Sequence, residues 1–149
     1  GAIEMRRVLD AGGLCVVQDR TVEDVESTHP DHWIRATLFE AFPRLLETER
    51  GRRPSTPGYA KVMRESGFEK VEVLKYSETR KHYASFSQLE SEILARKGKS
   101  ILFELTDEEL RIYCAALAAK VEDAPIVEAD SWTIWLGSVD LTDGICITS

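Results

Sequence analysis

The feature that most constrains the fold is a succession of patterns near the start of the chain, Glu4 to Asp19 (EMRRVLDAGGLCVVQD). A helical turn runs into the pair Gly12-Gly13, and glycine tolerates the left-handed backbone in which helices commonly end. The next residues, Leu14 to Val17, are unbroken apolar, as expected of a buried strand. The stretch therefore predicts a helix that ends and leads into a strand over Leu14–Asp19, within a domain that contains both kinds of element.

Two later stretches have the period-two alternation of strands. They are Phe68 to Ser77 and Ile126 to Leu136, the second rich in aromatic and β-branched residues. Between them, Ser87-Gln88-Leu89-Glu90 and Thr106-Asp107-Glu108-Glu109 fit the capping box that opens helices. The expected fold is therefore α/β, or α+β in appearance. It has about three mixed strands, flanking helices and a helical insertion over about residues 84–124.

The first two strands are separated by further helical patterns. Apolar residues recur at helical intervals in His32 to Leu46, with a break expected at Pro43, and again in Pro57 to Gly67. The Gly/Pro-rich run Glu47 to Gly58 predicts a loop, and Asp143-Gly144 predicts a hairpin over about residues 138–149. With 149 residues of which 43% are hydrophobic, the chain is expected to form a single domain over 1–149 that buries a core.

Composition argues against several classes of partner and site. A net charge of −7 and a pI near 5.0 disfavour nucleic acid and anionic membranes as partners. The three cysteines have no spacing that suits zinc, so no metal site is expected, and reduced thiols favour a cytoplasmic location. No apolar run reaches the 18 residues of a membrane span.

Three of these landmarks resemble, in order, the later half of class I S-adenosylmethionine-dependent methyltransferases. EMRRVLDAGG with its apolar strand and Asp19 resembles the fifth-strand region, although Asp10-Ala11 stands where the family usually has Lys-Pro. RESGF with the alternating valines resembles the step into the sixth strand. DSWTIWL resembles the last strand, which pairs beside the sixth. The resemblance covers about residues 3–137 and implies the substrate-side half of a Rossmann-like sheet.

The cofactor half of such a fold has no counterpart in the sequence. A Rossmann-like site needs a glycine-rich turn that leads from a strand into a helix, whereas Gly12-Gly13 leads from a helix into a strand. No cofactor-binding residue is therefore expected, and the isolated chain is not expected to be catalytic. S-adenosylmethionine would bind only if another segment or chain supplied the missing half.

Five residues are weak candidates for a methyl-acceptor site, because ligands of open α/β sheets bind beyond the carboxyl ends of the strands. Asp19, His29 and His32 could orient a nucleophile or remove its proton, and Arg20 and Trp33 could bind substrate. The plainer interpretation is favoured. In it Asp19 makes local backbone bonds, the histidines lie on a loop surface and Trp33 belongs to the core.

The first strand also bears on partners. Without a preceding strand, Leu14–Val17 would be an unprotected apolar edge, which predicts pairing with a second copy, a complementary chain or the tail hairpin. Two functions follow as alternatives. One is a methyltransferase-like half that needs completion, and the other is a self-associating scaffold or small-molecule binding protein without enzymatic activity. An unrelated α+β domain that carries these landmarks by chance is the third.

Overall fold

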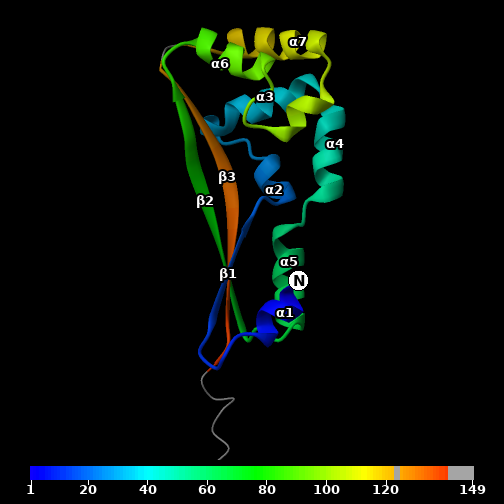
Figure 1. The fold of residues 1–149 in the computed structure, drawn as a ribbon, viewed down its shortest axis with the longest axis vertical. Helices are drawn as coiled ribbons and strands as arrows, with labels where there is room; N and C mark the ends of the chain where they lie inside the picture. Colours follow the sequence, from blue (N-terminus) through cyan, green and yellow to red (C-terminus); the bar gives the residue numbers. More distant parts are fainter. Residues whose placement is uncertain (123–124, 141–149) are drawn as a thin grey trace, which may run out of the picture. The chain divides into compact units, whose positions relative to one another are not determined.

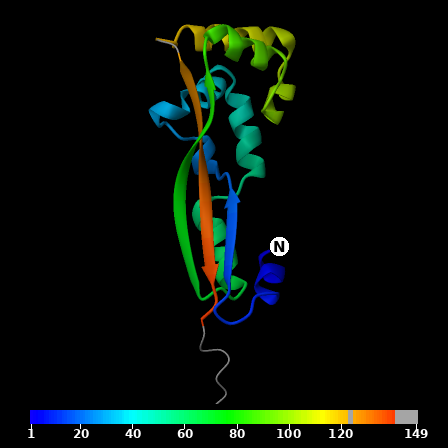
Figure 2. The same ribbon diagram turned by 60° about the vertical axis from the view of Figure 1, so that its left-hand side comes forward.

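The structure is a computed structural model that describes residues 1–122 and 125–140. It has the mixed α/β fold that the sequence predicts, with a three-stranded antiparallel sheet in the order β1-β3-β2 (Figure 2). The strands are β1 (Leu14–Asp19), β2 (Lys70–Tyr83) and β3 (Ile126–Ser138). The predicted tail hairpin at Asp143-Gly144 lies outside the described residues.

One helix precedes β1, further helical elements lie between β1 and β2, and the remaining ones lie between β2 and β3, in the predicted insertion (Figure 1). In chain order they are α1 (Ala2–Arg7), α2 (Val22–Val25), η1 (Pro30–His32), α3 (Trp33–Ala41), α4 (Pro43–Arg52), α5 (Thr56–Glu65), α6 (Phe86–Leu94), η2 (Ser100–Glu104) and α7 (Asp107–Ala118).

Helix boundaries follow local capping chemistry. The expected break at Pro43 is confirmed, because α3 ends at Ala41 and Pro43 opens α4, where its missing N–H costs nothing. The capping box of Thr106 and Glu109 is present at the start of α7. The box predicted at Ser87 is wrong: Ser85 caps α6 by accepting a hydrogen bond from the N–H of Gln88, whose side-chain oxygen accepts one from the N–H of Ala84.

The loop predicted over Glu47–Gly58 is also wrong. Helix α4 continues to Arg52, and α5 begins at Thr56 behind the N-cap Ser55. Glu47 pairs with Arg50, and Glu49 with Arg52, at the i,i+3 spacing that favours a helix. These side-chain pairs, one helical turn apart, stabilise α4 despite the low helix propensity of Gly51 in its interior.

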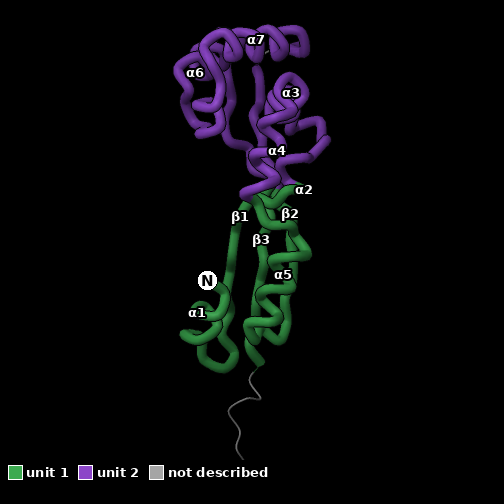
Figure 3. Tube along the Cα trace, turned by 90° about the vertical axis from the view of Figure 1, so that its right-hand side faces the viewer, with its two compact units in different colours: residues 1–23, 53–76, 132–149 green, residues 24–52, 77–131 purple. Residues whose placement is uncertain are grey.

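Contacts divide the chain into two compact units (Figure 3). Unit 1 comprises residues 1–23, 53–76 and 132–149, and unit 2 comprises residues 24–52 and 77–131. Strands β2 and β3 contribute residues to both units. Each unit has its own cluster of buried hydrophobic side chains, and the prediction of a single domain stays a prediction.

In unit 1, β1 runs antiparallel to β3 in a register from Leu14 opposite Ser138 to Asp19 opposite Thr133. The core residue Trp135 is fully buried; its ring centroid lies 4.8 Å from that of Tyr59, and its Nε1 donates to the carbonyl of Thr56 at 3.1 Å. The rest of this cluster consists of Ala2, Cys15, Ala60, Met63, Phe68 and Val139.

Gly137 allows this packing, because a Cβ there would lie 2.6 Å from Met63 Cε and 2.7 Å from Phe68 Cδ1. No side chain larger than hydrogen fits without displacing the core. The glycine thus brings β3 close to the hydrophobic side chains of unit 1.

Strand β1 is an edge of the sheet formed by the described residues, as the sequence predicts. The expectation of a buried strand holds for one face only, because Cys15 is buried whereas Leu14 is 58% exposed and Val16 60%. The two faces differ because side chains alternate along a strand and only one face packs on the core of unit 1.

Unit 2 is mainly helical, and α3 and α6 each pack against α7. Its buried cluster includes Leu38, Leu89, Leu110 and Leu117. The hydroxyl of Tyr113 is buried with them and donates to the carbonyl of Ile34 at 2.7 Å. Burial raises the pKa of this hydroxyl. Helices of the predicted insertion thus form one wall of the larger core.

Candidate functional site

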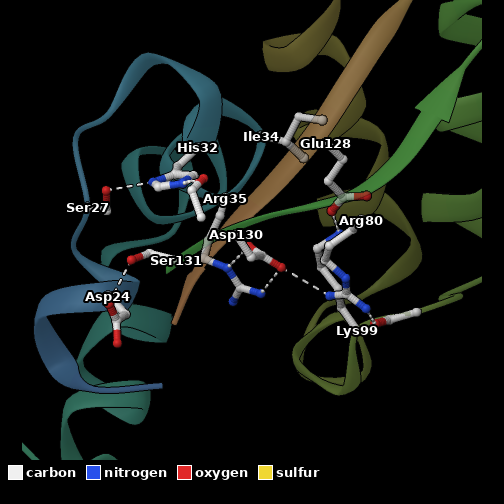
Figure 4. A network of polar contacts seen from close by, with 12 residues as sticks. Asp24, Ser27, His32, Ile34, Arg35, Arg80, Lys99, Glu128, Asp130 and Ser131 are labelled. Atoms are coloured by element: carbon white, nitrogen blue, oxygen red, sulfur yellow. Dashed lines mark hydrogen bonds and ion pairs between the residues drawn. The ribbon is translucent and has the colours of Figure 1, made fainter. Parts of the chain in front are cut away.

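Unit 2 carries a network of buried polar and charged side chains (Figure 4). Its most buried members are Asp24, His32, Arg35, Glu128 and Asp130, each less than a tenth exposed. Burying charge is costly unless each group is paired, so such a cluster must be held by mutual contacts. The contacts that hold it come from α3, β2, β3 and the segments beside them, all in the described part of unit 2.

Asp130 is the centre of the network. It lies on β3, and Arg35 of α3 donates from Nε to Oδ1 at 2.9 Å and from Nη2 towards Oδ2 at 3.4 Å. Arg80 of β2 donates from Nη1 to Oδ2 at 3.1 Å. One carboxylate thus receives two guanidinium groups, and these three side chains together carry a net positive charge.

Glu128 anchors the next part of the network, two residues before Asp130 on β3. It pairs with Lys99, and the Tyr83 hydroxyl donates to its Oε2 at 2.9 Å. The same hydroxyl lies 3.3 Å from Oε2 of Glu92, whose pKa is lowered mainly by its hydrogen bond from Lys81. Burial and the nearby Glu92 carboxylate raise the pKa of Tyr83 to about 12, so its hydroxyl stays a donor at neutral pH.

A serine–histidine arrangement forms the other side of the network. His32 Nδ1 lies 2.7 Å from Ser27 Oγ, and Nε2 lies 3.0 Å from Ser77 Oγ. Burial and then the nearby His29 lower the pKa of His32, which favours the neutral imidazole. A neutral imidazole has one donor and one acceptor nitrogen, so His32 can accept a proton as a general base does.

His29 precedes this pair and has a local role. Its Nδ1 accepts from the N–H of Asp31 at 3.2 Å and so caps η1. Its ring centroid lies 5.2 Å from that of His32. The short helix η1 therefore sets the distance between the two imidazoles.

A hollow of about 290 Å³ borders the charged part of the network. It is lined by Arg80, Lys81, Tyr83, Glu92, Lys97, Gly98, Lys99 and Glu128. All of these residues belong to unit 2, so the hollow is complete within one unit.

The five residues singled out from the sequence fall into both units. Asp19 and Arg20 lie in unit 1, and His29, His32 and Trp33 lie in unit 2. In unit 2, His32 is buried rather than on a loop surface, and Trp33 packs against the hydrophobic cluster. The plainer interpretation, which placed the histidines on a loop surface, is therefore wrong for His32. It agrees with the packing of Trp33.

The two unit 1 candidates make local contacts. Oδ1 of Asp19 accepts from the backbone N–H of Arg20 at 2.7 Å and lies 3.5 Å from Nη1 of Arg53. The Arg20 guanidinium is 4.3 Å from the centroid of the Trp132 ring, a cation–π contact. The local backbone bond of Asp19 agrees with the plainer interpretation, and a role of either residue in substrate binding stays a prediction.

Sequence reasoning missed the charged centre of the network. Glu128 and Asp130 are two residues apart on a strand that is otherwise largely buried, a spacing that places both acids on one face. Arg35 likewise lies in the apolar pattern of α3. Acids and an arginine at core positions were the available signal, because such residues are seldom buried unless paired.

The connections that follow β1 and β2 differ from the strand-to-helix turn of a Rossmann-like cofactor site. β1 leads into α2 through Arg20-Thr21, and β2 into α6 through Ala84-Ser85, so neither connection has the glycine-rich turn. Gly12 and Gly13 instead form backbone hydrogen bonds with Val139 next to the ends of β1 and β3. The Gly12 N–H donates to the carbonyl of Val139 at 2.9 Å, and Gly13 accepts from the N–H of Val139 at 3.2 Å.

No family model matches the chain, and no curated protein matches it either. Within residues 1–122 and 125–140, no group of histidine, cysteine and acidic side chains is arranged to hold a metal ion. In the same residues, no helix has the length and apolarity needed to cross a membrane.

Proposed function

We propose that the chain is the substrate-side half of an S-adenosylmethionine-dependent methyltransferase fold and needs a separate cofactor half for catalysis. The observation that carries the proposal is the strand arrangement. β3, whose sequence resembles the family's last strand, lies beside β2, whose sequence resembles the sixth. That is the pairing that the resemblance implies, and strands of unrelated origin need not reproduce it.

The edge position of β1 adds independent support. β1 pairs with β3 on one side, and its apolar Leu14 and Val16 are exposed. An apolar strand at an edge favours pairing with a further strand. In the proposed complete fold, that strand belongs to the cofactor half.

Residues of unit 2 suit the handling of a methyl acceptor. The neutral imidazole of His32, held between the hydroxyls of Ser27 and Ser77, is the group best suited to take a proton from an acceptor hydroxyl or amine. In this proposal Ser77, which is exposed on β2, marks the side from which a ligand reaches the imidazole.

A second candidate function is a self-associating scaffold or small-molecule binding protein. The same exposed side chains on β1 favour it, since two copies can pair through like edges. The two functions differ in what completes the sheet: a cofactor half in the first, and a second copy in the second.

Calorimetry separates them. We expect this chain alone to show no saturable binding of S-adenosylmethionine. A version extended by any upstream coding sequence with a glycine-rich strand–turn–helix should bind it and transfer the methyl group. Binding by the chain alone, or an extended version that does not bind, contradicts the methyltransferase proposal.

Sedimentation tests the scaffold alternative with a matched pair of variants. Val16→Lys places a charge on the β1 edge strand, and Val62→Lys places one on the exposed face of α5 in the same unit. If copies pair through β1, Val16→Lys abolishes the dimer and Val62→Lys retains it. A wild-type chain that stays monomeric at high concentration excludes self-association through this edge.

A further inference from the structure

The hollow in unit 2 has a charge opposite to that of the whole chain. It is lined by four cationic side chains, Arg80, Lys81, Lys97 and Lys99, and by two carboxylates, Glu92 and Glu128, whereas the full chain carries −7. A local excess of positive charge in a concave site attracts anions even on an acidic protein.

The carboxylates pair with some of the cationic groups but are fewer than them. Glu92 contacts Lys81, and buried Glu128 contacts Lys99. Arg80 is held in place by buried Asp130, which accepts a hydrogen bond from Nη1 of Arg80 and another from Nε of Arg35. When Arg35 and Asp130 are counted with the lining residues, there are five cationic groups and three carboxylates. The net charge of +2 is therefore unchanged.

The loop between α6 and η2 supplies the remaining wall. Gly98 adopts a left-handed backbone with φ of 80°, and its carbonyl accepts from Nη2 of Arg80 at 3.4 Å. A side chain at this φ is strained, so glycine suits the turn that brings Lys97 and Lys99 to the same hollow. The loop thereby links two lysines to the arginine of β2.

We propose that this hollow binds the oxyanion group of a small molecule, a phosphate or a carboxylate. Guanidinium and ammonium groups donate charge-assisted hydrogen bonds to such oxygens, and a buried second layer keeps them oriented. A volume of about 290 Å³ suits a compact ligand. The inference rests on unit 2 alone and is independent of the methyltransferase proposal.

The test is a titration of the full chain with inorganic phosphate, followed by amide chemical shifts at constant ionic strength with chloride as the reference. A parallel titration with malonate tells a phosphate from a carboxylate preference. We expect saturable shifts centred on residues 80–83 and 97–99 with at least one of the two anions. Shifts that do not saturate with either anion, or that centre elsewhere, overturn the proposal.

Matched variants test the role of charge. Lys97→Gln should weaken binding of the preferred anion roughly fivefold to tenfold through loss of one charge-assisted contact. Lys61→Gln removes the same charge from exposed α5 in unit 1 and should change affinity by less than about twofold, because Lys61 does not line the hollow and salt screens a solvent-exposed charge. Equal effects of the two variants overturn the site.

A third variant has an effect of opposite sign. Glu92→Gln removes a carboxylate from the wall and releases Lys81, so it should strengthen binding severalfold. Damage to the fold would weaken binding instead, so a gain identifies the electrostatic role. Unchanged or weaker binding by Glu92→Gln, with the fold intact by its amide spectrum, contradicts the proposal.

Discussion

The two units bury their side chains by different means. Unit 1 packs β3 against α5 through shape, with fully buried Trp135 beside Gly137, where a side chain would not fit. Unit 2 combines a larger helical cluster with buried charges, above all the pair of Arg35 and Asp130. Stability in unit 1 therefore depends mainly on volume, although Arg20 is also buried there, and in unit 2 it depends also on the pairing of several buried charges.

This difference indicates where a site is expected. Well-packed apolar side chains offer a ligand little to bind, whereas buried ion pairs position donors beside open space. The hollow of unit 2 lies next to such donors. Substitutions in the two units should accordingly differ in how much they lower the free energy of unfolding. They should also differ in which second substitution restores it.

The largest effect is expected from Asp130→Ala. It leaves the guanidinium of Arg35 buried without its carboxylate, which should lower the free energy of unfolding by about 3–5 kcal/mol. The double variant Asp130→Ala with Arg35→Met should recover much of that loss. Urea denaturation measures both, and a double variant as unstable as the single one would show that charge pairing is not the cause.

Trp135→Phe should have a smaller effect in unit 1. It keeps an aromatic ring beside Tyr59 but removes the hydrogen bond to the Thr56 carbonyl, at a cost of about 1–2 kcal/mol. Hydrogen exchange should report the loss in residues 53–76 and 132–140. Equal loss of protection throughout unit 2 would show that the two units unfold together.

Thr106→Ala tests helix capping in unit 2. The change removes the hydroxyl that accepts from the N–H of Glu109, so α7 should lose about 1 kcal/mol. Thr106→Ser keeps the hydroxyl and serves as the control. If both variants unfold at the same urea concentration, the cap does not stabilise the fold.

The smallest effect concerns pH. Burial lowers the pKa of His32 below its usual 6.5, so below that pH the unfolded chain binds the proton more readily than the folded chain. The stability contribution of the neutral imidazole is complete above pH 6.5 and falls on acidification towards the lowered pKa. His32→Gln should flatten the pH dependence of stability in this range, measured by urea denaturation. A variant that keeps the full pH dependence would show that another group causes it.

Secondary structure was largely predictable, because its signals are local. The strand Leu14–Asp19 has the predicted bounds, and the break at Pro43 and the cap at Thr106 are present. The errors arose where two local signals compete. Gly51 suggested a loop, but charge pairs one turn apart continue the helix to Arg52.

The candidate site was much less predictable. His32 was among the residues chosen from the sequence, but its partners Ser27 and Ser77 were not. Arg35 and Asp130 are 95 residues apart, and nothing near either residue indicates the other. Periodicity shows which face of an element is buried, but it does not show which other element covers that face.

The sequence by itself determined the element types, several of their ends, the apolar character of β1 and the acidic charge of the chain. Tertiary structure alone decided that β1 pairs with β3 and that the side chains of Leu14 and Val16 lie on the exposed face of β1. It also gathered cations around one hollow in an acidic protein. The reason is physical: backbone preferences and caps act within a few residues, whereas burial and charge pairing depend on side chains that meet only after the chain has folded.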